Sequence, residues 1–157
     1  MGTSPRPIIA IAAAAALALP SVATAQAPAF RAGLGDLMTA FVQPRHTKLG
    51  LAGMEQNWPY AAYELNELRG AFDKVAEMVP TYRNFSIPDL ITASVKEKLT
   101  ALDQAIKAKD PEQFVALYGQ LTAACNACHQ STDKGMIVIR VPTLSAFPDQ
   151  DFRPPKP

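Results

Sequence analysis

Apolar residues recur three and four positions apart along most of the chain, which is the spacing of one face of an α-helix. Four such stripes are present, and they cover residues 33–56, 57–80, 91–109 and 110–135. Pro44 lies inside the first stripe and is expected to kink or split that helix, because proline lacks a backbone N–H. Helices of this length with short connections predict an all-α fold, an antiparallel four-helix bundle.

Capping residues support these boundaries. Asn57 and Asp110 each precede a proline in the first helical turn, which is typical of a helix start. The lysines at 107 and 109 suit the C-terminus of the third helix. Gly135 is expected to close the last turn of the fourth helix.

The chain changes character after the fourth helix. Met136–Val141 has the composition of a strand, but no second run is present for it to pair with, so we expect an extended segment laid over the bundle. The last 16 residues contain five prolines, which favour an irregular or polyproline-like tail. Together they form an extended, Pro-rich C-terminal segment at 136–157.

The first 25 residues have the pattern of a secretory signal peptide. Arg6 is followed by twelve uninterrupted apolar residues, Ile8–Leu19, and the stretch ends in small residues, Ala23–Ala25. A transmembrane helix needs about 20 apolar residues, so we expect cleavage, no membrane span afterwards, and a periplasmic location. The expected organisation is a signal peptide at 1–25, one helical domain at 26–135, and the segment at 136–157.

Charge narrows the class of partner. The sequence has 15 Lys and Arg against 14 Asp and Glu, and removing 1–25 leaves 14 of each. A balanced chain without a basic stripe lacks the electrostatic signature of nucleic-acid binding.

The candidate chemistry lies in one pentad, Cys125-Asn-Ala-Cys-His129, which has the C-x-x-C-H form that attaches c-type haem. Positions i and i+3 share a helix face, so Cys125 and Cys128 can form thioethers with the two vinyl groups of one porphyrin. His129 then brings an imidazole to the iron. The pentad predicts one covalently attached haem c with His129 as its proximal ligand.

Three other roles for the two cysteines are weaker. A thioredoxin-type centre places the pair at a helix N-terminus, where the dipole lowers a thiol pKa, whereas this pair lies near a C-terminus. A structural zinc site needs a fourth ligand, and His46 on a distant helix is the remaining histidine. A plain structural disulfide is the third alternative.

A C-x-x-C-H near the end of the last helix of a four-helix secreted chain resembles the class II c-type cytochromes, the cytochrome c′ group. The stretches His46–Gly53 and Asn57–Glu64 are similar to a set of short periplasmic c-type cytochromes. The resemblance implies a methionine ligand from the first helix in low-spin members and a possible homodimer through the first two helices. In cytochrome c′ the fourth helix usually continues past the motif, whereas Gln130–Gly135 breaks off here.

The sixth position of the iron decides between functions. In an antiparallel bundle the pentad lies level with residues 37–41, at 1.5 Å of rise per residue, and this window contains Met38. His46 has the stronger ligand chemistry but lies farther along the helix. Each has an alternative role: Met38 as core filler, and His46 as a propionate contact or part of a solvated cationic face.

Two functions correspond to these alternatives. With a sixth protein ligand, the chain is a periplasmic electron carrier rather than an enzyme, and it transfers single electrons between redox protein partners. With an open position, it is a five-coordinate haem protein that binds NO or CO as a sensor or scavenger.

Overall fold

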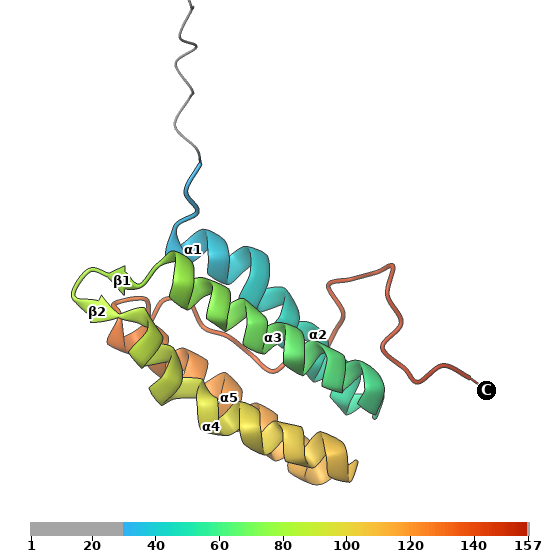
Figure 1. Cartoon of the computed structure of the whole chain (residues 1–157). Coiled ribbons are helices and arrows are strands. Elements are labelled where there is room, and N and C mark those ends of the chain that lie inside the picture. Colours follow the sequence, from blue (N-terminus) through green and yellow to red (C-terminus); the bar gives the residue numbers. More distant parts are fainter. Residues whose placement is uncertain (1–29, 157) are drawn as a thin grey trace, which may run out of the picture. The chain divides into compact units, whose positions relative to one another are not determined.

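The computed structural model describes residues 30–156, and the predicted signal peptide at 1–25 lies outside them. The described part is mostly helical, which confirms the all-α prediction. The first helical stretch runs without a break through α1 (Leu34–Leu37), η1 (Met38–Val42) and α2 (Gln43–Met54). Three long helices follow (Figure 1), namely α3 (Trp58–Met78), α4 (Ile87–Ala108) and α5 (Pro111–Ser131). None of the described helices is long and apolar enough to cross a membrane.

Pro44 does not break the first helical stretch. Proline removes one helical hydrogen bond and its ring crowds the carbonyl four residues earlier. The turn before Pro44 widens into η1, a π-helical turn in which the Gln43 N–H bonds to the Met38 carbonyl. The helical stretch is therefore not split at Pro44, and a wider turn accommodates the proline.

The predicted N-caps are confirmed. The Asn57 side chain accepts a hydrogen bond from the Tyr60 N–H at 3.3 Å, and the Asp110 carboxylate accepts one from the Gln113 N–H at 2.9 Å. Each bond satisfies a backbone donor that has no partner inside its helix. The starts of α3 and α5 are thus fixed by these caps.

The end of α5 differs from the prediction. The helix stops at Ser131, and Asp133 rather than Gly135 adopts the left-handed conformation, with φ 58°. The Lys134 N–H then bonds to the His129 carbonyl at 2.7 Å, which closes the helix in the way that glycine usually allows. Aspartate is one of the few residues that tolerate this conformation, so the assignment of this role to Gly135 was wrong.

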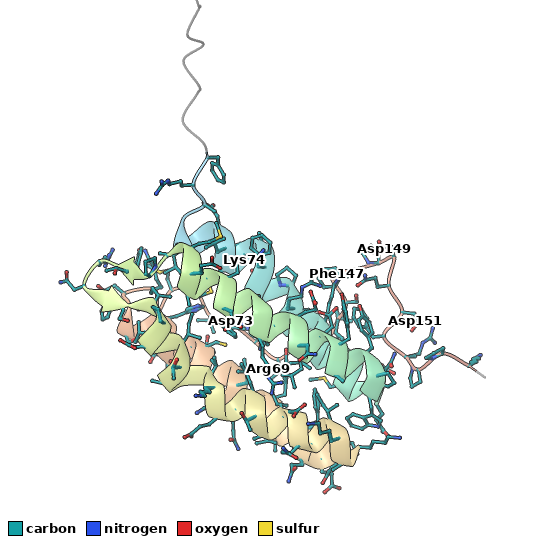
Figure 2. All side chains as sticks on the ribbon, viewed as in Figure 1. Arg69, Asp73, Lys74, Phe147, Asp149 and Asp151 are labelled. Atoms are coloured by element: carbon teal, nitrogen blue, oxygen red, sulfur yellow. The ribbon has the colours of Figure 1, made fainter. Side chains whose placement is uncertain are left out.

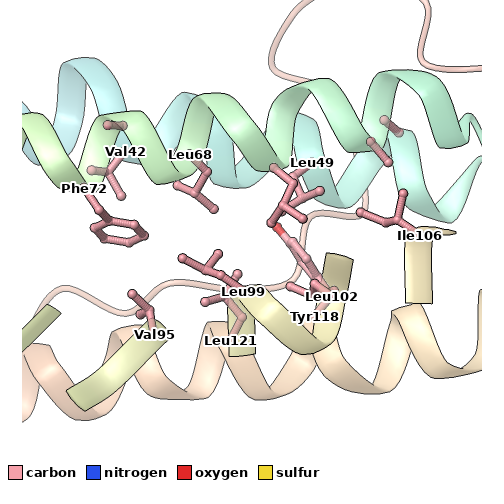
Figure 3. Packing of buried hydrophobic residues seen from close by; sticks show 14 of the residues in the cluster. Val42, Leu49, Leu68, Phe72, Val95, Leu99, Leu102, Ile106, Tyr118 and Leu121 are labelled. Atoms are coloured by element: carbon pink, nitrogen blue, oxygen red, sulfur yellow. The ribbon is translucent and has the colours of Figure 1, made fainter. Parts of the chain in front are cut away.

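The helices pack as two pairs. α2 packs against α3 and α4 against α5, and the pairs meet where α3 contacts α4 and α2 contacts α5. Figure 3 shows buried side chains from both pairs meeting between them, among them Leu68, Leu99 and Leu121. α2 and α5 run antiparallel, because Gly53 faces Phe114 whereas the earlier His46 faces the later Thr122.

The remaining described segments are short or irregular. A two-stranded antiparallel hairpin, β1 (Thr81–Tyr82) and β2 (Phe85–Ser86), joins α3 to α4 (Figure 1). Residues 132–156 form neither helix nor strand. Near its end this segment packs back onto the helices: Phe152 is buried and stacks on Tyr60, with ring centroids 5.5 Å apart. The Phe147 ring (Figure 2) lies under the Lys48 ammonium.

Candidate functional site

A cavity of about 420 Å³ lies between the start of the first helical stretch and the end of α5. Further walls come from β1, the first turns of α4 and the segment that follows α5. Cofactor and small-molecule sites usually measure about 300–1,000 Å³. All the site residues expected from the sequence line this one cavity, namely Met38, His46, Cys125, Cys128 and His129.

Cys125 and Cys128 lie one turn apart on α5, half-buried, and both are free thiols. Burial, with a further contribution from Cys128, raises the pKa of Cys125 to about 11. Burial also raises the pKa of Cys128, against a hydrogen bond with Ser94. Both thiols are therefore protonated near neutral pH, unlike the thiolates of disulfide oxidoreductases.

The His129 imidazole has a defined tautomer. Its Nδ1 lies 2.7 Å from the Ile137 carbonyl oxygen. A carbonyl oxygen only accepts hydrogen bonds, so Nδ1 carries the proton and donates. In the neutral ring the free lone pair is then on Nε2, which is the arrangement found in histidines that ligate metals.

Met38 reaches the same cavity from the first helical stretch. It is half-buried and is the first residue of the π-helical turn η1. Such turns occur frequently at functional sites. The antiparallel register predicted that Met38 lies level with the pentad, and the shared cavity agrees with this prediction.

His46 also lines the cavity, but it is 4% exposed and hydrogen-bonded within the protein. Its Nε2 lies 3.0 Å from the Thr122 hydroxyl, and its Nδ1 lies 3.0 Å from the Tyr118 hydroxyl. The Tyr118 hydroxyl also donates to the His46 backbone carbonyl at 2.7 Å, and the Thr122 hydroxyl donates to the Tyr118 backbone carbonyl at 2.9 Å. Burial lowers the pKa of His46 to about 4. The ring is neutral near pH 7, and its interpretation as part of a solvated cationic face was wrong.

Three residues contribute to this site in roles that the sequence did not predict. Tyr118 and Thr122, the partners of His46, are spaced i and i+4 within the apolar stripe of α5, which is the signal that could have found them. Lys134 is the only Lys or Arg among the described residues that line the cavity. Its position depends on the left-handed turn at Asp133, which the sequence did not predict.

The described residues contain no group of three or more His, Cys, Asp or Glu side chains placed to hold a metal ion. Comparisons of the chain with protein-family models, with curated proteins and with solved structures found no match.

Proposed function

We propose that the chain is a periplasmic mono-haem c-type cytochrome that transfers single electrons between redox protein partners. One observation carries the proposal: a single cavity is lined by both thiols of the C-x-x-C-H pentad and by His129, whose Nδ1 is already committed to the Ile137 carbonyl. The free lone pair on Nε2 suits that nitrogen to bind an iron.

The residues present fit a haem. Cys125 and Cys128 are free and share one helix face, as thioether attachment to a single porphyrin requires. Much of the cavity wall is apolar, including Leu34, Leu90 and Ile91, as suits the body of a macrocycle. When bound, the haem iron would supply the one-electron chemistry. This chain would hold the group, orient the proximal imidazole and limit the access of water.

The contacts between helices support a specific arrangement of the fold. We propose that the two packed helix pairs form an antiparallel four-helix bundle with the haem at one end and the extended Pro-rich segment packed outside. The support is the set of contacts between α2 and α3, α3 and α4, α4 and α5, and α2 and α5. This arrangement is that of the class II c-type cytochromes, which the sequence resembles.

Met38 is the proposed sixth ligand. It lines the cavity, and none of the described side chains makes a hydrogen bond with it. His46 would have to give up the contact between its Nε2 and the Thr122 hydroxyl before binding iron through that nitrogen. Loss of a buried hydrogen-bond partner costs about 1–3 kcal/mol. This cost favours the thioether of Met38 as the ligand. His46 then acts as a neutral member of the cavity wall.

The cellular setting of the proposal comes from the sequence. The signal peptide at 1–25 supports export, and the compartment we propose is the periplasm. The formally neutral mature chain implies little long-range electrostatic steering toward partners. A homodimer through the first two helices is part of the family resemblance.

Optical spectra test this function against the gas-binding alternative. The protein is produced in cells that mature c-type cytochromes, and the ferrous spectrum is recorded with and without CO. A low-spin spectrum that CO does not change supports an electron carrier. A high-spin spectrum that shifts with CO supports the five-coordinate alternative, and a colourless protein overturns both.

A further inference from the structure

Asn126, which lies between the two cysteines, makes a paired contact with the segment that follows α5. Its Nδ2 donates to the Ile139 carbonyl at 2.9 Å, and its Oδ1 accepts from the Ile139 N–H at 2.8 Å. One side chain thus satisfies both backbone groups of one residue, as a neighbouring β-strand does. Asparagine suits this role because its planar amide carries a donor and an acceptor on a short stem.

The same segment supplies the acceptor for His129. Ile137, two residues before Ile139, accepts the hydrogen bond from His129 Nδ1 at 2.7 Å. Asn126 and His129 lie about 4.5 Å apart along the helix axis, and the two isoleucines about 6.6 Å apart along an extended chain. The segment therefore runs back along α5, and the two contacts are made side by side.

We propose that Asn126 is a positioning residue for the His129 imidazole: by clamping Ile139, it holds the Ile137 carbonyl where it accepts the Nδ1 proton. The inference rests on the proposed function, because its consequence is for an iron ligand. A hydrogen bond to Nδ1 fixes the ring orientation and raises the basicity of the ligand. A more basic ligand favours the ferric state, so the clamp lowers the reduction potential.

Few other contacts hold this part of the segment. Up to Ile137, two backbone hydrogen bonds of the closing turn hold the segment. The Lys134 N–H donates to the His129 carbonyl, and the Ile137 N–H donates to the Lys134 carbonyl. Beyond that turn, Asn126 provides both hydrogen bonds that the described residues make to Ile139. Ile137 and Ile139 also line the cavity, so the clamp fixes one of its walls.

The test uses Asn126→Ala in the haem-loaded protein, with Gln120→Ala at an exposed position of the same helix as the matched control. We expect the midpoint potential of Asn126→Ala to shift upward and its Ile139 amide to exchange on the order of tenfold faster. The control should match the wild type in both. Asn126→Ala with a wild-type potential and wild-type Ile139 exchange would overturn the proposal.

A second variant changes the partner of Asn126 and leaves the pentad unchanged. Ile139→Pro removes the N–H that Asn126 Oδ1 accepts. If both residues act through one contact, each single variant raises the potential and the double variant adds little. Fully additive shifts would overturn the clamp. This variant also serves if Asn126→Ala fails to mature.

A haem-free chain separates this inference from the proposed function. If the wild-type protein carries no covalent haem, the proposed function fails, but the His129 Nδ1–H and the Ile139 amide can still be followed by NMR. Faster exchange of both protons in Asn126→Ala supports the clamp, and unchanged exchange overturns it.

Discussion

Gly50 of α2 lies directly against Tyr118 of α5, so that a Cβ at position 50 would be 2.5 Å from the ring Cζ and the hydroxyl oxygen. One turn further along, a Cβ at Gly53 would overlap the Phe114 ring. The absence of side chains lets the two helices approach closely. The close approach in turn brings the Tyr118 hydroxyl to the His46 carbonyl.

We expect Gly50→Ala to lower the free energy of unfolding by about 1–3 kcal/mol, because the added methyl overpacks this contact. Gly70 is the matched control, since it is exposed in α3 and a methyl group added there would meet no atom within 4 Å. Gly70→Ala should gain up to about 1 kcal/mol from helix propensity. Denaturant unfolding of both variants checks this, and equal stability of the two would contradict the close contact.

The buried His46 predicts a pH dependence of stability. Its pKa is lowered to about 4 by burial, against about 6.5 in an unfolded chain. Between these values the unfolded state binds more protons, so the free energy of unfolding falls as pH drops from 6.5 toward 4. The loss is on the order of 3 kcal/mol.

Comparison with His46→Gln isolates this contribution. Burial raises the pKa of Glu64, which makes its own effect on stability opposite in sign, but Glu64 is present in both chains. Urea unfolding at several pH values should give a flatter profile for the variant between pH 4 and 6.5. Identical slopes for the two chains would show that His46 does not titrate as its burial requires.

If Met38 is the sixth ligand, Met38→Ala should convert a low-spin ferrous spectrum to a high-spin one that responds to CO, because an axial position becomes free. Met54→Ala is the control, since Met54 is also half-buried but does not line the cavity. Absorption spectra of the two variants, with and without CO, check this: Met54→Ala should keep the low-spin spectrum of the wild type. A low-spin spectrum that persists in Met38→Ala but is lost in His46→Ala would assign the ligand to His46.

The C-terminal segment should contribute to stability through Phe152, which is 6% exposed and stacks on Tyr60 at an interplanar angle of 5°. We expect Phe152→Ala to cost about 1–3 kcal/mol, less than a central core phenylalanine, because most residues of this segment are exposed and the surroundings can adjust to the lost ring. Leu144→Ala at an 83% exposed position is the control and should change stability by less than about 0.5 kcal/mol. Thermal unfolding measures both variants, and equal stability of Phe152→Ala and Leu144→Ala would contradict the packing of Phe152.

The sequence predicted the features that depend on local patterns. The starts of α3 and α5 followed from Asn57 and Asp110, whose side chains bond to backbone donors three residues later. The position of Met38 level with the pentad was predicted from the rise per residue along two antiparallel helices, the first and the fourth. Both features depend only on spacing along the chain, so a single sequence is enough to predict them.

The features that the sequence did not predict depend on contacts across the fold. For Pro44 the sequence predicted a kink or a split, and the wide turn η1 was neither of these. Burial of His46 depends on Tyr118 and Thr122 of α5. Their spacing places both on one face of α5, but it does not show that this face meets His46 on another helix. Likewise, the left-handed Asp133 makes an ion pair with Arg83 at 2.9 Å, a partner fifty positions away.

The most direct test of covalent haem attachment is the intact mass of the mature protein from cells that attach haem to C-x-x-C-H sequences, measured together with a pyridine haemochrome spectrum. We predict a mass equal to the processed polypeptide plus one haem, with the added mass lost in a Cys125→Ser, Cys128→Ser double variant. A mass equal to the polypeptide alone, with no haemochrome, would contradict it.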